Sequence, residues 1–512
     1  MNLKINRECL SVSEKLYDGI QEQSVELDYI LPDYYNDIFK MVKCTASPSV
    51  TSYSINGDTL NYELTVDLKF LYCSEMNNKL NCIDQRLVYN KSVNLGDSVN
   101  NPVVKICPKA GRPNCRVVNK RRIDMRGAVS VKIKVCGESK QEAVCSVSGM
   151  NVQTKKTPVN YMAKKINKSK NITISEDIEL GQSKETIIGI VHTDVNLNDP
   201  ETKVIAGKLV VKGNAELKTL YTCESGMETI SFNMPYSQII NMEGLDDSYS
   251  VCVNLSKIQI DISPAPDSEG NNKLIKCELK IGINCCAYKT ITVDLVSDLY
   301  STSYPCQYAS SKLAVEQPPI TLNEKFQNQI LLQNDDNGIL CVYDVRCDTK
   351  NINVSIDNEN KLIHISGMLC YTALVKNENN IPQCIEKDSA FEYDIKCDDI
   401  TENSTAEIEI SSVDCTYTLT DSNGISVRAD ICLNGELYSS AFINAVTDLT
   451  VDDSVKITRD GDYALKLYYG VKDENVWNIA KKYCTSVNAI IEENSLDKEC
   501  LSEDGMLLIP IV

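Results

Sequence analysis

Few side chains in this sequence are suited to catalysis or metal binding. Among 512 residues there are two histidines, His192 and His364, which excludes many histidine-based schemes of acid–base chemistry and metal ligation. The 23 cysteines include no CxxC spacing, so a zinc site of the usual kind is not indicated. The chain also contains no GxxxxGKS/T, GxGxxG or GxSxG motif, and no pair of its 71 acidic residues stands out. We therefore expect a non-enzyme that holds no cofactor and no metal.

His364 reads as an ordinary histidine of a strand. His364 alternates with Ile363 and Ile365, which predicts a strand in which its side chain lies on the face opposite to theirs.

The most distinctive stretch lies near the carboxyl end and reads NVWNIAKKYCTSVNAIIEENSL. It contains Trp477, which is the only tryptophan of the chain. Two residues before Ile479, the indole should lie beside the main apolar stripe of a helix rather than inside it. A partly exposed indole next to a charged turn is typical of an interface anchor, and ordinary core packing is the alternative. Trp477 is therefore a candidate for partner recognition.

Four short elements are predicted around this tryptophan. ALKLYY alternates like a strand, Val476 to Cys484 has helical spacing, and MLLIPIV reads as a second strand. Between them, Val487 to Asn494 reads as a second helix, with Ser486 as its cap and Asn494 as its stop. The predicted core of this small module consists of Leu465, Leu467, Ile479, Ala480, Ile490, Leu507 and Ile509.

The order of these elements resembles a LysM module over about a tenth of the chain. VWNIAKKY, SVNAIIEENSL and LLIP match its pattern, with Trp477 in the tryptophan place, Asn494 in the asparagine place and Pro510 in the proline place. The resemblance implies a shallow groove, between the first turn and the loop after the second helix, that binds N-acetylglucosamine polymers.

The first turn departs from that family. Where LysM modules have Gly-Asp-Thr, this chain has Asp473, Glu474 and Asn475. Glycine permits positive φ and a close approach of ligand to backbone, and we expect an aspartate to remove both advantages. Two adjacent carboxylates are also costly to desolvate under a neutral sugar, and suit a positively charged protein partner better. The predicted partner-binding residues are Leu465, Asp473, Glu474, Asn475, Val476, Trp477, Ile479, Asn494 and Leu496.

The rest of the chain reads as strands and contains internal repeats. Three similar stretches place Tyr72, Tyr221 and Tyr371 at spacings of 149 and 150 residues, and a second set ends at Cys136, Cys286 and Tyr438. These matches predict a mainly β protein of three tandem β-rich domains followed by a βααβ module. The predicted division is 1–150, a basic linker at 151–171, 172–300, a linker at 301–325, 326–445, and the module at 463–512.

One copy carries an additional segment, ELDYILPDYYNDIFKMV. Pro32 predicts an extended approach, Asp33 can cap a short helix, and Ile38, Phe39 and Met41 would give that helix an apolar face. LPDYYNDIFK, followed by NKRRIDMRGAVSVKIKV, resembles the SPOCS domain of spore-forming bacteria. The second and third copies lack the Leu-Pro-Asp segment and match less well.

SPOCS copies with a terminal LysM module resemble the SipL family of clostridial spore coat morphogenetic proteins. The resemblance implies a structural adaptor in the mother-cell cytoplasm, at the forespore surface and in the spore coat. Its LysM module would bind the morphogenetic ATPase SpoIVA, and the two would recruit further coat proteins. The alternative from another class is a binder of peptidoglycan or chitin fragments, which would need export.

Charge is unevenly distributed along the chain. The formal net charge of −19 makes general nucleic-acid binding an unsuitable role. Residues 101–170, however, carry 17 Lys and Arg against three Asp and Glu. This segment is either a solvated strand face and connector, or a docking surface for an acidic partner or for acidic regions of the same chain; membrane headgroups are a third reading. The candidate docking residues are Arg112, Arg116, Lys120, Arg121, Arg122 and Arg126.

We expect the protein to stay in the cytoplasm, where it is synthesised. No apolar run approaches the roughly 20 residues of a membrane span, and the start of the sequence lacks the pattern of a signal peptide. The cysteines are odd in number and show no repeating framework, so we expect reduced thiols. Oxidative cross-linking in a harsher setting is a further hypothesis.

Overall fold

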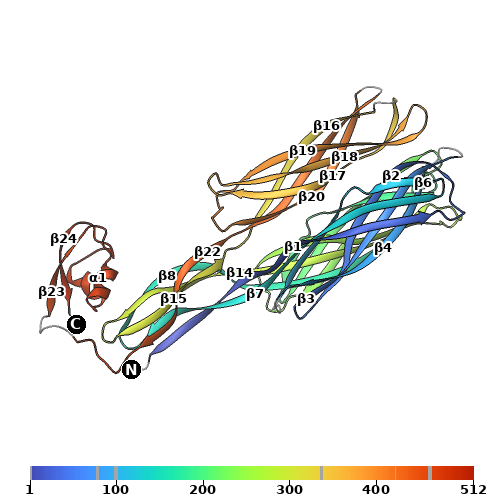
Figure 1. Cartoon of the computed structure of the whole chain (residues 1–512). Coiled ribbons are helices and arrows are strands. Elements are labelled where there is room, and N and C mark those ends of the chain that lie inside the picture. The colour runs from blue at the N-terminus through green and yellow to red at the C-terminus, as the bar shows by residue number, and fades with distance from the viewer. Residues whose placement is uncertain are drawn as a thin grey trace.

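The protein is mainly β, as the alternation of its sequence predicts. The structure, a computed structural model, describes residues 3–75, 80–96, 102–334, 338–420, 423–458 and 464–511. Within these ranges it contains 24 strands and two short helices. Figure 1 shows an elongated molecule, with three β-sandwiches at one end and a small module containing both helices at the other.

The first sandwich packs two sheets against each other. One sheet joins β1 (Lys4–Ile30), β7 (Arg122–Ser148), β5 (Val103–Ala110) and β6 (Asn114–Asn119), and the other joins β2 (Ile38–Asn56), β3 (Thr59–Ser74) and β4 (Leu80–Asn94). Every second side chain of β3 from Leu60 to Tyr72 is buried between the sheets, which is the period of a strand with one face in the core. All strand pairs of this sandwich are antiparallel.

The second and third sandwiches repeat this plan. The second contains β8 (Val152–Glu179), β13 (Ser250–Ala265) and β14 (Leu274–Ser301) in one sheet, and β9 (Gly189–Leu197), β10 (Glu201–Ile205), β11 (Lys208–Thr222) and β12 (Met227–Asn241) in the other. The third contains β16 (Ile320–Gln333), β20 (Thr405–Leu419) and β21 (Gly424–Tyr438), packed on β17 (Ile339–Asp357), β18 (Leu362–Asn377) and β19 (Pro382–Lys396). In each sandwich, the strand that comes first in the sequence pairs with the strand that comes last: β1 with β7, β8 with β14, and β16 with β21.

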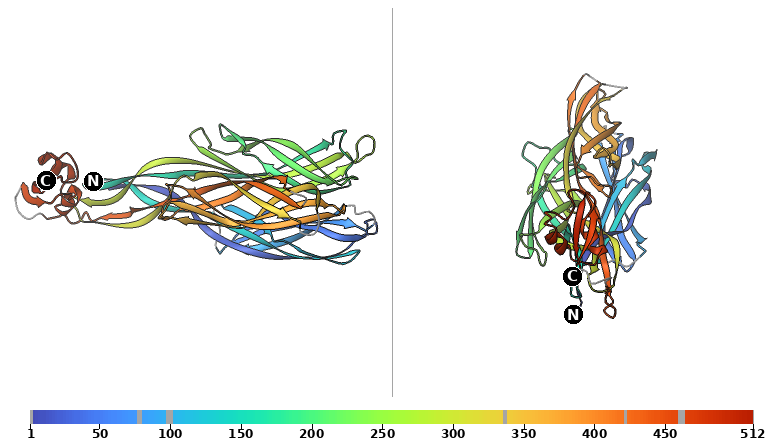
Figure 2. Two further views of the ribbon diagram at one scale, coloured as in Figure 1. Left: turned by 90° about the horizontal axis from the view of Figure 1, so that it is seen from above. Right: turned by 90° about the vertical axis from the view of Figure 1, so that its left-hand side faces the viewer.

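A stalk of three two-stranded ribbons continues from the sandwiches toward the module. Its ribbons are the outer parts of β1 with β7 and of β8 with β14, and the pair β15 (Cys306–Glu316) with β22 (Ser440–Val451). Val144, Val296 and Val446, one from each ribbon, are fully buried in its core. Figure 2 shows the ribbons lying together along the long axis.

The third ribbon is separated from its sandwich by a break that the other two lack. Pro318 and Pro319 stand between β15 and β16, and proline provides no backbone N–H for a ladder.

Both predicted linkers are in fact mostly strand. Residues 151–171 lie largely in β8, whose pairing with β14 continues from Val152 to Glu179. Residues 301–325 contain all of β15 and the beginning of β16. These stretches looked like linkers because they are polar and basic or rich in serine and proline. In the structure they are edge strands, whose backbone is paired on one side while many side chains face solvent.

Two further local expectations were wrong. No helix follows Asp33, because residues 33–35 form a turn and Ile38 already begins β2. In the repeat, Tyr72 and Tyr221 lie within two residues of the ends of β3 and β11, whereas Tyr371 lies six residues before the end of β18. All three rings are fully buried, but the third copy was matched out of register.

The carboxyl-terminal module consists of β23 (Leu465–Gly470), α1 (Val476–Lys482), α2 (Val487–Glu493) and β24 (Gly505–Pro510). Its two strands pair antiparallel from Leu465 with Pro510 to Gly470 with Gly505. Residues 463 and 512 of the predicted module range lie outside the described residues. Figure 1 places the module at the tip of the stalk.

Candidate partner-binding module

Helix α1 is positioned by its first residues. Asn475 precedes the helix in an extended conformation, and its side-chain oxygen accepts a hydrogen bond of 2.8 Å from the backbone N–H of Trp477. Val476, Ile479 and Ala480 then point into the core of the module. Of the predicted binding residues, Asn475, Val476 and Ile479 therefore build the helix and its core rather than a surface.

Helix α2 is held to the second strand by Asn494. The side-chain amide of Asn494 donates to the carbonyl oxygens of Ile490 and Leu508, at 2.8 and 2.7 Å, and its oxygen accepts from the backbone N–H of Leu508 at 2.7 Å. Ser486 occupies the cap position, but its side chain makes no capping hydrogen bond. Leu496 is half-buried against the same core. Asn494 and Leu496 thus act within the module.

The indole of Trp477 is buried, contrary to the expectation of a partly exposed anchor. The side chain is 6% exposed and packs edge-on against Tyr300 of β14, with 5.1 Å between the ring centroids. Its Nε1 donates a hydrogen bond of 2.7 Å to Asp298 Oδ2. Asp298 and Tyr300 belong to the end of the stalk, so the tryptophan joins the module to the rest of its own chain.

Asp298 collects several further donors at this contact. Its Oδ1 accepts from Lys481 Nζ at 2.6 Å and from the hydroxyl of Tyr308 at 2.7 Å. The hydroxyl of Tyr300 completes the contact. It donates a hydrogen bond of 2.7 Å to the carbonyl oxygen of Thr485, a residue of the loop between the two helices. Burial alone would raise the pKa of Asp298, but the hydrogen bonds from Lys481, Tyr308 and Trp477 hold it below its ordinary value. The carboxylate is therefore ionised at neutral pH and balances Lys481.

The first turn of the module does not expose two carboxylates. Glu474 accepts from the hydroxyl of Tyr468 at 2.6 Å and from the backbone N–H of Val471 at 3.2 Å, so its carboxylate is used in closing the turn. Asp473 is exposed and has a φ of 67°. We had expected an aspartate to lose the positive φ that glycine allows. Aspartate is among the few residues that tolerate this region, and here it keeps the left-handed turn.

One face of the module is apolar, and no described residue covers it. Leu465, Leu467 and Tyr469 alternate along β23 and point away from the core, and Met506 on β24 is the cross-strand partner of Tyr469. Leu467 is 67% exposed. The prediction that Leu465 and Leu467 belong to the core is wrong, because Lys466 and Tyr468 occupy the inward-facing positions of the strand. Leu465, which is also among the predicted binding residues, lies at the surface. We call Leu465, Leu467, Tyr469 and Met506 the outer sheet face.

Sequence reasoning missed the contact of Trp477 with Asp298, and of the outer sheet face it named only Leu465 among the predicted binding residues. Nothing in the stretch around Asp298 linked it to a tryptophan 179 residues later. The alternation of LKLYY was visible, but apolar or aromatic residues occur in both phases, so its phase could not be fixed.

The basic segment near Arg121 is used mainly within the first sandwich. Arg121 donates to the carbonyl oxygens of Leu31, Pro32 and Tyr35 and to Asp37 Oδ1, at 2.7 to 3.3 Å. It therefore supports the turn that carries the Leu-Pro-Asp sequence.

Most of the other candidate docking residues also have acidic partners in the chain. The ion pairs are Arg112 with Asp388, Lys120 with Glu75, Arg122 with Asp28, and Arg126 with Asp124. Arg116 is exposed. Arg112 bridges to β19, so this pair connects the first and third sandwiches.

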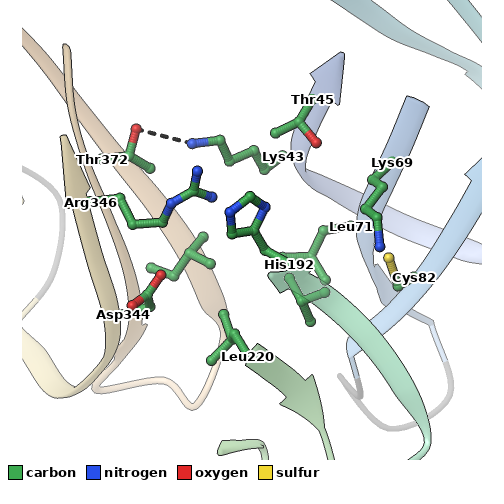
Figure 3. A pocket seen from close by; sticks show the side chains of 12 residues that line it. Lys43, Thr45, Lys69, Leu71, Cys82, His192, Leu220, Asp344, Arg346 and Thr372 are labelled. Atoms are coloured by element: carbon green, nitrogen blue, oxygen red, sulfur yellow. Dashed lines mark hydrogen bonds between the residues drawn. The ribbon is translucent and has the colours of Figure 1, made fainter. Parts of the chain in front are cut away.

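A small cavity, lined by charged and by apolar side chains, lies where the three sandwiches meet (Figure 3). Lys43, His192 and Arg346 come to it from the first, second and third sandwich, respectively. Its volume of about 20 Å³ is enough for roughly one water molecule. His192 Nε2 lies 2.6 Å from Asp194 Oδ1; burial and the nearby Arg346 nevertheless lower the pKa of His192 to about 4, so the ring is neutral at pH 7.

The other histidine lies where the sequence placed it. Ile363 and Ile365 are buried, and His364 faces the opposite side of β18, 2.5 Å from Asp394 Oδ1. Within the described ranges, neither helix is long and apolar enough to cross a membrane.

Comparison with known proteins identifies part of the chain. Residues 186–263 match the family described as SipL, SPOCS domain. This part is a SipL-type SPOCS domain. The SPOCS match covers β9 to β13 of the second sandwich, whereas the sequence motif had pointed most strongly to the first copy. No curated protein and no solved structure is similar enough to count as a match. The SPOCS domain indicates a sporulation-related protein.

The two copies share the turn that the Leu-Pro-Asp motif marks. In the first, the N–H groups of Leu31 and Ile38 donate to the carbonyls of Arg121 and Lys120. In the second, the N–H groups of Leu180 and Ile187 donate to those of Lys273 and Asn272. The backbone turn therefore recurs without the Leu-Pro-Asp sequence.

Proposed function

We propose that this chain is a non-enzymatic structural adaptor of spore coat assembly, which binds a SpoIVA-type morphogenetic ATPase through its carboxyl-terminal module. It would act in the mother-cell cytoplasm at the forespore surface and help the coat layers to encase the forespore. The SPOCS match supports a sporulation role. The resemblance of the module to LysM supports its use as the binding unit.

The observation that carries the proposal is the outer sheet face. Four large apolar side chains, from Leu465 to Met506, lie exposed on a module of fewer than 50 residues at the end of the stalk. Contiguous exposed apolar surface on a small soluble domain is typical of an interaction site. The neighbouring exposed Asp473 offers a charge for a basic group of the partner.

The remaining predicted binding residues receive an indirect role in this proposal. Trp477 is occupied by Asp298 and Tyr300, and Asn475, Val476, Ile479 and Asn494 build the module. They would fix the outer sheet face in place, and the direct contacts would come from Leu465, its neighbours and Asp473.

The proposal is tested by calorimetric titration of the full chain with a purified SpoIVA-type ATPase. We expect saturable binding that Leu467→Glu weakens by at least about 100-fold, since a carboxylate would have to be desolvated at the centre of the contact. The matched control is Leu340→Glu on β17, an exposed leucine at 56% against 67% for Leu467, which should bind like the unchanged protein. Equal binding by both variants would refute the assignment of the outer sheet face, and no binding by the unchanged chain would refute the partner.

Binding of peptidoglycan or chitin fragments is the second candidate function. It is favoured by the φ of 67° at Asp473, because the first turn keeps the left-handed backbone that the glycine of LysM modules would adopt there. A chitooligosaccharide titrated into the same protein distinguishes the two functions. Heat of binding that Asp473→Ala changes and Leu467→Glu does not would support sugar recognition.

A further inference from the structure

The three sandwiches meet at equivalent positions of their strands. In each, one strand carries a β-bulge next to the junction, and the residue that follows the bulge lies opposite a leucine of the neighbouring strand. These pairs are Lys43 with Leu71, His192 with Leu220, and Asp344 with Leu374, and all six residues line the junction cavity. In the end-on view of Figure 2 the sandwiches spread around the long axis. The cavity therefore lies where an approximately threefold arrangement has its centre.

The charges around this centre are not balanced. Of the twelve residues that line the cavity, three are cationic, Lys43, Lys69 and Arg346, and one is anionic, Asp344. His192 is neutral at pH 7, because burial and the nearby Arg346 lower its pKa to about 4. The lining thus carries a surplus of positive charge in a space that is largely shielded from solvent.

Arg346 has donors that the chain does not use. Its side chain is only 19% exposed, and a guanidinium has five N–H groups. The carboxylates of Asp194 and Asp348 come no closer to it than 3.7 Å, which is too far for a hydrogen bond. Among the residues that the structure describes, none accepts a hydrogen bond from this side chain. Because a buried donor without an acceptor costs free energy, the site favours an acceptor from outside the chain.

Lys43 faces the same space from the first sandwich. Its side chain is 15% exposed, and its Nζ donates one hydrogen bond of 3.0 Å, to Thr372 Oγ1. Glu386 lies 3.6 Å away, so further N–H groups of the ammonium are left for another acceptor. Figure 3 shows the charged ends of Lys43 and Arg346 directed into one space beside the ring of His192. Two cations in such a space repel each other, and an anion between them would attract both.

We propose that the junction cavity binds one monatomic anion such as chloride, which accepts hydrogen bonds from Arg346 and Lys43. The volume of about 20 Å³ admits roughly one water molecule, and a chloride ion is only slightly larger. A phosphate or a carboxylate is too large for this space. Since the two donors belong to the third and the first sandwich, the ion would tie these sandwiches together. The site lies far from the outer sheet face and is independent of the proposed partner.

The first test measures the midpoint of thermal unfolding of the full chain while sodium chloride replaces sodium gluconate at constant ionic strength. Gluconate is too large for the cavity, and constant ionic strength keeps charge screening the same. We expect the midpoint to rise with chloride, in a saturable way, by about 2–4 °C, because an ion that binds only the folded state stabilises it. A midpoint that does not change would overturn the proposal.

Two arginine variants separate this site from a general effect of the salt. Arg346→Gln removes the main donor and should lose the chloride-dependent rise. Arg428→Gln is the matched control, because Arg428 lies in the same sandwich, is half-exposed and pairs with Asp430 at 3.3 Å; it should keep the rise. An equal rise in both variants would assign the effect to bulk chloride and would overturn the proposal.

Crystals of the unchanged full chain, grown in sodium bromide, decide the matter even if Arg346→Gln does not fold. Bromide scatters X-rays anomalously, so we expect an anomalous peak between Lys43 and Arg346. A water molecule at that position, without an anomalous peak, would overturn the proposal.

Discussion

The two ends of the molecule join their parts by different means. At the broad end, the three sandwiches meet through charged groups around the small cavity and through ion pairs such as Arg112 with Asp388. At the narrow end, the terminal module is held by one indole, one tyrosine ring and one carboxylate, those of Trp477, Tyr300 and Asp298.

This difference indicates which end is available to a partner. The basic segment looked like a docking surface, but most of its candidate residues are paired with acidic groups of the same chain. The module uses one side for its attachment to the stalk and leaves the outer sheet face exposed. In this molecule, the surplus of positive charge in the basic segment does not mark a free surface, because most of those side chains form ion pairs within the chain. The exposed outer sheet face is the better indication of a free surface.

The largest effect is expected from removing the indole. Trp477→Ala should destabilise the module by about 3–5 kcal/mol, because it deletes a buried aromatic side chain from the contact with Tyr300. Hydrogen exchange of α1 and α2 in the full chain measures the loss. Trp477→Phe is the matched control, which keeps an aromatic ring beside Tyr300 but loses the bond to Asp298 and part of the buried ring volume. If Trp477→Ala leaves exchange unchanged, the indole is not the anchor.

The carboxylate at the same contact should have the next largest effect. Asp298→Ala leaves Lys481 and the Trp477 N–H without this acceptor, at a cost of about 2 kcal/mol to the attachment of the module. Asp294→Ala, an exposed aspartate of the same strand, should cost less than about 0.5 kcal/mol. The readout is hydrogen exchange of α1 and of the end of β14, and equal protection in the two variants would contradict the role of Asp298.

At the broad end, His192 should make unfolding depend on pH. Its pKa is lowered from about 6.5 in the unfolded chain to about 4 in the folded state, so the unfolded state binds the proton more readily. The stabilisation is complete above about pH 6.5 and is lost as the pH falls toward 4. With a side chain 22% exposed, we expect about 1–2 kcal/mol.

The control for this prediction removes the titrating ring. The free energy of unfolding in urea should be measured at pH 7 and pH 4.5 for the unchanged protein and for His192→Gln. It should fall more steeply with decreasing pH in the unchanged protein. Asp194 beside it also has a lowered pKa and changes charge only at lower pH. Parallel pH profiles for the two proteins would show that His192 does not titrate at the junction.

The smallest effect concerns the basic segment. Arg112→Ala should destabilise the protein by no more than about 1 kcal/mol, and less at high salt, because its pairs with Asp388 and Glu386 are partly exposed. Arg116→Ala, an exposed arginine of the same segment, should have no measurable effect. Thermal unfolding at low and high salt compares the two. An equal loss in both variants would argue against a specific role for the Arg112 bridge.

Features of the fold that depend on neighbours in the sequence could be predicted, and features that depend on contacts between distant residues could not. The mainly β class follows from local alternation, and the face of His364 from its isoleucine neighbours. The linkers were misjudged because an edge strand of a stalk is as polar as a connector. The pairing of β8 with β14 joins residues more than 90 residues apart, which no local pattern reveals.

The candidate site shows the same limit. The position of Trp477 on a helix could be predicted, but its burial depends on Asp298 and Tyr300, which lie far away in the sequence. The phase of β23 was ambiguous because Leu467 and Tyr468 are both apolar enough for a core.

The central claim is that the outer sheet face, and not the basic segment, meets the partner. Hydrogen exchange of the full chain, with and without a SpoIVA-type ATPase, tests it most directly. The account predicts new protection in 465–470 and 505–510 and none in 112–126. New protection confined to 112–126, with exchange at the module unchanged, would contradict it.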